Sequence, residues 1–146
     1  MNPSHLRWRL NLYPPYLGTG IRVTHIADDF RRIVVEMPLR WYNKNYVGTH
    51  FGGSLSAMTD PHYMLMMIQI LGREYIVWDQ SGTIEYRKPG RGRVRAEFVI
   101  KDALVEDIRT ATADGSRCLR TLLVDVVDEE GDVVAHVTRT LYIRKK

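Results

Sequence analysis

Two adjacent glycines, Gly52 and Gly53, stand directly before a long apolar segment that predicts a helix. Glycine has no side chain, so a ligand can come close to the backbone amides at this point. The first amides of a helix lack an intrahelical partner, and the helix dipole favours negative charge beside them. A thioester carbonyl that becomes an oxyanion is one such charge. The glycine pair therefore predicts an oxyanion-binding position; the alternative is a tight turn that enters a buried helix.

A carboxylate follows within the same expected helix. Asp60 would lie about two turns in, among residues that are mostly apolar. An ionised carboxylate in such surroundings is costly unless it is paired or used. Helical spacing would place Asp60 on one polar stripe with Ser56, Thr59 and Tyr63, which suits the wall of a site. Pro61 removes a helical hydrogen bond and tends to kink the helix. The alternative is a structural Asp60 bonded to neighbouring hydroxyls or to an arginine.

A basic turn lies further along the chain, where Arg87, Lys88, Arg91 and Arg93 surround Pro89. Arginine and lysine are common phosphate ligands, so this turn is a candidate to meet the phosphates of coenzyme A; the alternative is a solvated turn. The formal charge of the chain is +4 and its pI is about 9.3. That modest excess suits a phosphorylated small ligand, a nucleic acid or solubility alone. We expect no nucleic-acid partner, since the tryptophans are expected to pack rather than to stack on bases.

Other kinds of chemistry find no matching pattern. No pair of the five histidines has the spacing of a metal motif, so we expect no metal. The chain has no Gly-x-Ser-x-Gly elbow, no P-loop and no dinucleotide fingerprint. Cys118 is the only cysteine, which excludes an intrachain disulfide and favours a reducing cytoplasm. Neither a secretory signal nor a lipid-spanning helix is expected, so we predict a cytoplasmic protein with no membrane partner.

The elements that must position these residues follow from hydrophobic periodicity. A length of 146 residues favours a single domain over residues 1–146. Short helices are expected from Ser4 to about Tyr13, capped by Ser4, and over Ala103–Ala113. One long helix, apolar nearly all round, is expected over Gly53–Leu71. Alternating residues predict six strands, near residues 21–25, 33–37, 74–88, 94–100, 119–127 and 133–143.

Tight turns join three pairs of these strands, and we expect each pair to be antiparallel: the first two, the two that flank Pro89, and the last two. In the third strand, Ile76, Trp78, Ile84 and Tyr86 are expected to share one face. An antiparallel sheet with one long apolar helix is an α+β layout, and a sheet that curls around a central helix is the hotdog arrangement. Because one sheet covers only one side of that helix, we expect a second subunit to close over it.

The segment around these glycines resembles the signature of hotdog-fold acyl-CoA thioesterases of the phenylacetyl-CoA thioesterase type. Asn45, Gly48, Gly52, Gly53 and Asp60 fall in register with that signature. The stretch FGGSLSAMTDP is similar to a bacterial branch of the same superfamily. The resemblance continues at residues 86–89 and 124–135, so it covers nearly the whole chain.

The resemblance implies a role for each matching residue. Asp60 would act as nucleophile or general base, an amide of Gly52 or Gly53 would stabilise the oxyanion, and Asn45 would help to hold the thioester or water. The glycines of one subunit would meet Asp60 of its partner, in a homodimer or a dimer of dimers. The substrate would be an acyl-CoA, with coenzyme A as part of the substrate rather than a separate cofactor. The substrate-binding candidates are His50, Phe51, Ser56, Tyr63, Arg87, Lys88 and Arg91.

One position departs from the family pattern, because Phe51 stands where the family has histidine and His50 is shifted by one residue. Phe51 could instead line an acyl pocket. Two functions therefore stay open: an Asp60-dependent thioester hydrolase, and an acyl-thioester-binding or structural hotdog protein that has lost the catalytic histidine. A hotdog dehydratase ranks last, since that chemistry usually needs a histidine with a carboxylate.

Overall fold

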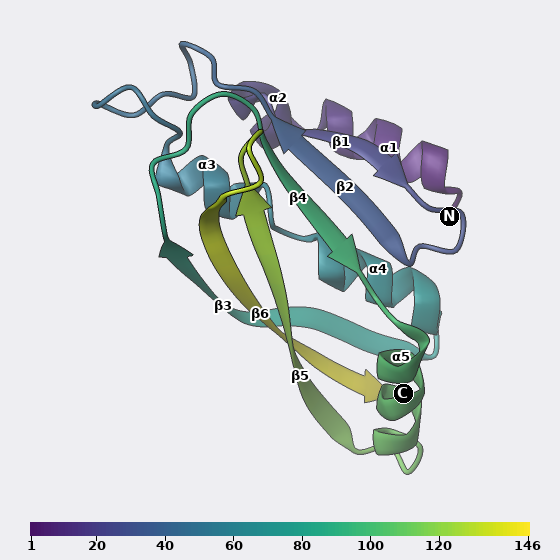
Figure 1. Ribbon diagram of the computed structural model, residues 1–146. Helices are drawn as coiled ribbons and strands as arrows, with labels where there is room; N and C mark the ends of the chain where they lie inside the picture. Colours follow the sequence, from purple (N-terminus) through teal and green to yellow (C-terminus); the bar gives the residue numbers. More distant parts are fainter.

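A six-stranded antiparallel sheet curves around a helical segment in the computed structural model, which describes residues 1–146 (Figure 1). The strands lie in the order β1-β2-β4-β5-β6-β3. They are β1 (Arg22–Ile26), β2 (Arg32–Met37), β3 (Tyr75–Tyr86), β4 (Val94–Val99), β5 (Arg117–Val127) and β6 (Val133–Lys145). The helices are α1 (Pro3–Leu12), α2 (Pro14–Thr19), α3 (Gly52–Ala57), α4 (His62–Leu71) and α5 (Asp102–Ala111). The α+β class and the hotdog arrangement expected from the sequence are confirmed.

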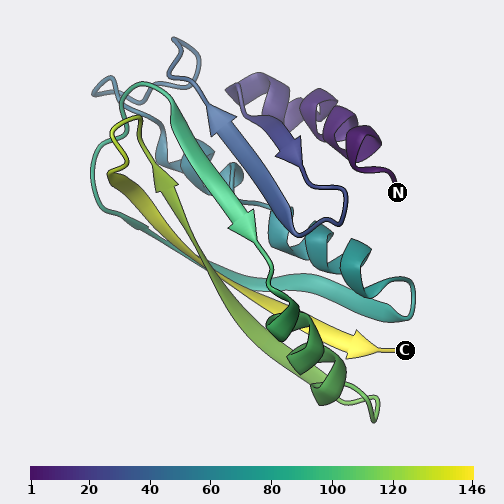
Figure 2. The ribbon, with the colours of Figure 1, turned by 45° about the vertical axis from the view of Figure 1, so that its right-hand side comes forward.

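The core lies between the curved sheet and the α3–α4 segment. Strand β4 alternates as expected, with Val94, Ala96 and Phe98 buried and the residues between them exposed. Met58 and Met66 meet this face from the helical segment and are fully buried. Figures 1 and 2 show α1 and α2 beside β1, and α5 near the C-terminus at the other end of the molecule. None of the five helices is both long enough and apolar enough to cross a lipid bilayer.

The first helix begins one residue earlier than expected, and its N-cap is two residues earlier. Asn2 accepts a hydrogen bond from the backbone N–H of Ser4 at 2.8 Å, so Asn2 is the N-cap and Ser4 lies inside the helix. Pro3 occupies the first helical position, where its missing N–H is no loss. Asn11, near the other end, donates to the carbonyl oxygen of Val23 and accepts from its amide. The Asn11 amide thus occupies the outer edge of β1 and fixes α1 to the sheet.

The central helical segment is divided, which corrects the expectation of one continuous helix over Gly53–Leu71. α3 ends at Ala57, residues 58–61 form a turn, and α4 starts at His62. Pro61 is the reason, because it has no N–H to bond to the carbonyl of Ala57 and its ring disfavours a helix at the residue before it. The polar stripe expected from helical spacing is therefore not formed.

The strands that flank Pro89 are not paired, and that expectation was wrong. β3 pairs along its whole length with β6 and forms one edge of the sheet, whereas β4 lies between β2 and β5. The carbonyl oxygen of Val134 accepts the amides of both Arg87 and Lys88. This contact leads the chain across the end of the β5–β6 hairpin before it enters β4.

The inner face of β3 also differs from the expected one. A bulge between Asp79 and Ser81 shifts the alternation. Before the bulge, Tyr75 and Val77 are buried, and Trp78 is half exposed. After it, Ile84 stands opposite the buried Val137. A single irregularity thus divides the expected apolar face between the two sides of the sheet.

The ladder between β4 and β5 is short. It contains the pairs Arg95 with Val127 and Ala96 with Val126, and Figure 1 shows the two strands diverging beyond that point toward α5. Tyr63 of α4 donates a hydrogen bond of 2.6 Å to the carbonyl oxygen of Leu123 in β5. A side chain from the central helix thereby satisfies a backbone group of β5, away from the two β4–β5 register pairs.

Candidate active site

A cavity of about 600 Å³ opens at the start of α3, and we call it the Gly52 cavity. Its walls come from the loop before α3, the first turn of α3, and the segment that follows β3. The lining residues are Asn45, Val47, Thr49, His50, Phe51, Gly52, Gly53, Leu55, Tyr86, Arg87, Lys88, Pro89 and Gly90. The structure therefore brings together most of the signature residues and the beginning of the basic turn.

Both glycines at the start of α3 have side-chain atoms close to the position that a Cβ would take. A Cβ at Gly52 would lie 2.8 Å from the hydroxyl oxygen of Tyr86, and one at Gly53 would lie 2.5 Å from ring atom Cε2 of Phe51. The first hydrogen bond of the helix runs from the amide of Ser54 to the carbonyl of Phe51. The amides of Gly52 and Gly53 precede it, as expected for donors at a helix start.

Asn45 organises the loop in front of the cavity. Its side-chain nitrogen donates to the hydroxyl of Thr49 at 2.8 Å and to the carbonyl of His50 at 3.3 Å. Its side-chain oxygen accepts from the amides of Val47 and Thr49. These four bonds use the donors and acceptor that the resemblance would assign to a thioester or a water molecule. In this subunit Asn45 shapes the loop.

His50 lies beneath the turn that links β3 to β4. Its Nε2 is 2.7 Å from the carbonyl oxygen of Gly92, and since a carbonyl can only accept, Nε2 carries the proton. Burial lowers the pKa of His50, and its Nδ1 is buried without a partner. The ring contributes to one wall of the cavity but is held by the turn. Phe51, in contrast, is half exposed and lies in the cavity mouth.

Asp60 lies outside the Gly52 cavity, in the turn between α3 and α4, and its side chain is exposed. It comes eight residues after Gly52, beyond the end of α3. Its backbone carbonyl accepts a hydrogen bond from the hydroxyl of Tyr16, which also contacts Nε2 of His62 at 2.8 Å. A hydroxyl has one proton to donate, so the Nε2–H of His62 donates to Tyr16. One subunit therefore does not place Asp60 beside the glycine amides.

Burial strongly perturbs the groups beneath this turn. It raises the pKa of Tyr16, to which the charge of Asp60 adds, and it lowers the pKa of His62 to about 3. His62 is fully buried and packs against Phe98, with the ring centroids 4.8 Å apart. The neutral Tyr16–His62 pair thus supports the backbone that carries Asp60.

A partly buried cluster of charged residues near Asp60 was not identified from the sequence. Arg139 of β6 points toward the helical segment, where its Nη2 donates to the hydroxyl of Thr59 at 3.1 Å and to the carbonyl of Ser56 at 3.3 Å. Burial raises the pKa of Asp79, the charge of Asp60 raises it further, and Arg139 opposes both effects. One oxygen of Asp79 and the Nε of Arg139 are buried without partners. The alternation of β6 carries the missed signal, since it places this arginine between apolar inward-facing residues.

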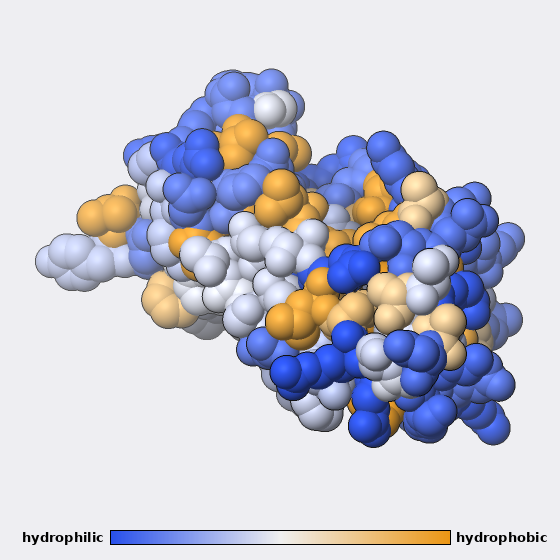
Figure 3. Space-filling view, turned by 90° about the horizontal axis from the view of Figure 1, so that it is seen from below, coloured by the Kyte–Doolittle hydropathy of each residue, from blue (hydrophilic) through white to orange (hydrophobic).

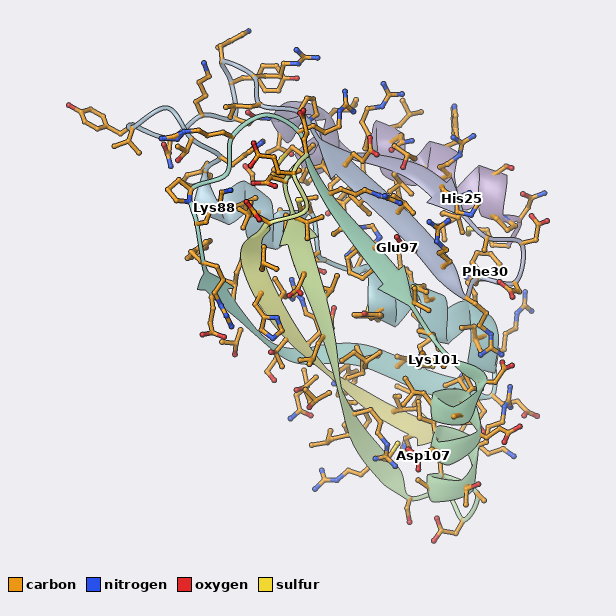
Figure 4. All side chains as sticks on the ribbon, viewed as in Figure 1. His25, Phe30, Lys88, Glu97, Lys101 and Asp107 are labelled. Atoms are coloured by element: carbon orange, nitrogen blue, oxygen red, sulfur yellow. The ribbon has the colours of Figure 1, made fainter.

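The basic turn is partly neutralised by its neighbours. The ammonium group of Lys88, which is labelled in Figure 4, lies close to two carboxylates. It is 2.8 Å from an oxygen of Asp128 and 2.7 Å from one of Asp132. These hydrogen bonds raise the pKa of Lys88. Arg87 forms an ion pair with Glu85 at 3.3 Å. Arg87 and Lys88 line the Gly52 cavity, whereas Arg91 faces a neighbouring depression beside the acidic turn.

The other two substrate-binding candidates are placed elsewhere. Tyr63 is buried in the core with its hydroxyl bonded to β5. Ser56 is partly buried at the end of α3, where its carbonyl accepts from Thr59 as well as from Arg139. Neither residue lines the Gly52 cavity. Tyr63 lies in α4, beyond the break at Pro61, whereas Ser56 lies near the end of α3.

Comparison with solved structures identifies the class of protein. A probable thioesterase from Pseudomonas aeruginosa, PA5026, superposes with a TM-score of 0.83 at 18% identity over 99% of this chain and 97% of its own. The phenylacetic acid degradation protein PaaI from Thermus thermophilus, solved as a point mutant, has a TM-score of 0.63 at 29% identity over 88% and 97%. TT0310 from the same organism has a TM-score of 0.63 at 30% identity over 88% and 96%. The chain therefore has the hotdog fold and is similar to PaaI, and the expected resemblance is confirmed.

The particular family follows from the sequence. A model of the family DUF4442, described as a domain of unknown function, matches residues 5–143, so this chain belongs to that family. A search of curated proteins gave no match.

Proposed function

We propose that this protein hydrolyses acyl-CoA thioesters, with Asp60 as the catalytic carboxylate and the Gly52 and Gly53 amides as the oxyanion site. The observation that carries the proposal is the Gly52 cavity, which combines free amides with the apolar side chains of Phe51 and Leu55. Its volume of about 600 Å³ lies within the range of roughly 300–1,000 Å³ that is typical of small-molecule sites. The description of PA5026 as a probable thioesterase agrees with this activity.

The chemistry needs only groups that the chain supplies. The carboxylate of Asp60 takes a proton from water while the water oxygen attacks the thioester carbonyl carbon. The negative charge that develops on the carbonyl oxygen is bound by an amide at Gly52 or Gly53. When the intermediate collapses, the carbon–sulfur bond breaks and the thiolate of the carrier takes up the proton. The products are a carboxylic acid and free coenzyme A. The single buried cysteine, Cys118, suits the cytoplasmic setting that we propose for this reaction.

The site requires a second subunit, because within one chain Gly52 begins α3 whereas Asp60 lies in the turn beyond the end of that helix. Two features support a homodimer. β3 is a long edge strand whose outer side has no partner in one subunit, and such an edge readily pairs with another chain. Several apolar residues of α4, among them Leu65 and Ile68, are only partly covered. Apolar side chains also surface between charged ones on the face shown in Figure 3. In the dimer, the glycines of one subunit would meet Asp60 of the other.

A second function is favoured by the residues around the cavity mouth. Phe51 stands at the family's histidine position, His50 is held by Gly92, and the amide of Asn45 is used within its own loop. A chain with these features can bind an acyl thioester in the same cavity without hydrolysing it. The two functions share the cavity and the ligand and differ in the role of Asp60.

Thiol release from a panel of short, long and aromatic acyl-CoAs separates the two functions. The wild type is expected to release coenzyme A, and Asp60→Asn is expected to reduce kcat by at least about a hundredfold while the fold and oligomeric state persist. Asp114→Asn, which changes an exposed carboxylate in another turn, is the matched control. Acyl-CoA binding without turnover in the wild type would establish the binding function. Turnover that survives Asp60→Asn would remove Asp60 from the mechanism.

A further inference from the structure

A second cavity, which we call the arginine cavity, lies where α1 and the residue after α2 meet β1 and β2. It encloses about 390 Å³ and shares no lining residue with the Gly52 cavity. Its lining includes Arg7 and Asn11 of α1, Arg22 of β1, Glu36 of β2, and Arg40 and Arg93. Four arginines from separate parts of the chain therefore converge on one polar depression.

The charges in this cavity are not balanced. Glu36 is its only carboxylate and is engaged by Arg93 at 3.0 Å. Arg7, Arg22 and Arg40 take part in none of the ion pairs of the structure. The lining thus carries a formal charge of +3, out of +4 for the whole chain. Like charges held together without a counterion repel one another, and a bound anion would relieve that repulsion.

The walls of the arginine cavity are fixed by the hydrogen-bonded side-chain amides of Asn11 and Asn43. Asn11 bonds to both backbone groups of Val23, which holds α1 against β1. The side chain of Asn43 is buried, donates to the carbonyls of Thr19 and Pro38, and accepts from the amide of Arg40 at 2.7 Å. The cavity is therefore a preformed feature of the fold, and only the ends of the arginine side chains need to move when a ligand binds.

The basic turn around Lys88 provides a contrast within the same molecule. Lys88 has Asp128 and Asp132 as partners, so its charge is already compensated. The arginine cavity has three guanidinium groups and no carboxylate left to oppose them. A phosphate that reaches both places meets uncompensated positive charge mainly in the arginine cavity.

We propose that the arginine cavity binds the phosphate or pyrophosphate group of an organic phosphate. Guanidinium groups bind phosphate oxygens with paired N–H donors, and three of them suit a group with more than one negative charge. A volume of about 390 Å³ is near the lower end of the range of roughly 300–1,000 Å³ for small-molecule sites. Two sources have this chemistry: free pyrophosphate, and the nucleotide end of coenzyme A. The proposal does not depend on hydrolysis at the Gly52 cavity.

Titration calorimetry tests the proposal with two probes, inorganic pyrophosphate and adenosine 3′,5′-bisphosphate. At least one probe is expected to bind saturably to the wild type, and Arg22→Gln and Arg40→Gln are each expected to weaken it about tenfold. Glu36→Gln is expected to tighten binding, because it removes the only opposing carboxylate. Arg117→Gln is the matched control, since Arg117 is exposed, makes no ion pair and lies outside the cavity.

The outcomes separate the sources and can overturn the proposal. Equal affinity for the two probes identifies free phosphates as sufficient, whereas tighter binding of the bisphosphate identifies a nucleotide ligand. The proposal is overturned if neither probe binds, or if Arg117→Gln weakens binding as much as Arg22→Gln and Arg40→Gln do. Calorimetry records binding alone, so the result of this test does not depend on whether the protein hydrolyses thioesters.

Discussion

Gly82 of β3 stands directly opposite Arg139 of β6, and the guanidinium group fills the space that a side chain at Gly82 would need. A Cβ at Gly82 would lie 2.8 Å from Nη1 of Arg139. The same guanidinium reaches Thr59 and Ser56 at the break between α3 and α4. The absence of a side chain in the edge strand thus allows β6 to hold the turn that carries Asp60.

The substitution Gly82→Ala tests this relationship, because the sign of the change in the free energy of unfolding depends on Arg139. In a strand, glycine is usually less favourable than alanine by roughly 0.5–1 kcal/mol, so the substitution alone would stabilise the fold. The clash with Arg139 is expected to reverse that, with a loss of about 1–2 kcal/mol from weakened hydrogen bonds at Thr59 and Ser56. Urea unfolding of Gly82→Ala measures the difference.

The control is the same substitution in an Arg139→Ala background. There the clash is gone, so Gly82→Ala should be neutral or stabilising. An equal loss in both backgrounds would show that Arg139 does not determine the need for glycine at this position.

His62 predicts a specific dependence of stability on pH. Its pKa is lowered from about 6.5 in the unfolded chain to about 3 in the folded one, because burial disfavours the charged ring. The unfolded state therefore binds more protons than the folded state below pH 6.5. The contribution of the neutral His62 ring to the free energy of unfolding is fully present above that pH and is lost progressively toward pH 3. Between pH 7.5 and pH 5 the loss from His62 alone should be about 2 kcal/mol.

Urea unfolding at several pH values checks the His62 prediction. His62→Gln should be less stable at pH 7.5 but should lose less stability than the wild type as the pH falls to 5. The control is His25→Gln, which removes an exposed imidazole; a change of slope as large as that of His62→Gln would show that burial of His62 is not the cause. If the free energy of unfolding of His62→Gln depends on pH as it does in the wild type, another group causes the loss of stability in acid.

Mixed subunits test whether the proposed site is shared. Subunits with Asp60→Asn would be combined with subunits that carry Gly52→Val, whose side chain collides with the hydroxyl of Tyr86. Each parent should be inactive, but a purified mixed dimer has one site with both defects and one intact site, so it should regain about half the wild-type activity. A mixed dimer as inactive as its parents would place all catalytic groups within one chain.

In the thioesterase signature that this segment resembles, a histidine stands at the position of Phe51. If that histidine polarises the thioester carbonyl, Phe51 should limit turnover. An imidazole N–H at this position can donate a hydrogen bond to the carbonyl oxygen, which a phenyl ring cannot do. Phe51→His should therefore raise kcat by about tenfold, measured as thiol release. Phe51→Leu is the control for changed shape and should not raise kcat. A slower Phe51→His enzyme would mean that the ring itself contributes to binding of the acyl group.

The fold was accessible from the sequence because most elements follow a local pattern. The alternation of β4 and the acidic turn between β5 and β6 are each encoded within a few residues. The position of β3 in the sheet could not be predicted in this way. Its partner β6 begins 47 residues after β3 ends, and long-range pairing leaves no local signature. The bulge at Asp79 was missed for a related reason: it changes which face a residue occupies without changing its neighbours in sequence.

The sequence predicted most residues of the candidate site, but it did not predict the structural roles of several of them. The glycines and Phe51 lie together as expected. The bonds of Asn45 within its loop and the contact of His50 with Gly92 depend on how the loop folds, which residue types alone do not specify. Arg139 lay in an alternating strand, where an inward charge was visible but its partners in the distant turn were not.

The short β4–β5 ladder has a mechanical consequence. Two register pairs join these strands, whereas eleven join β5 to β6. The sheet therefore consists of two parts, β1-β2-β4 and β5-β6-β3, which are joined only by the short β4–β5 ladder. Tyr63 lies between these two parts and bonds to Leu123 of β5. Widening the space between them breaks few ladder bonds, so the interior can change its width at this hinge while both parts stay intact.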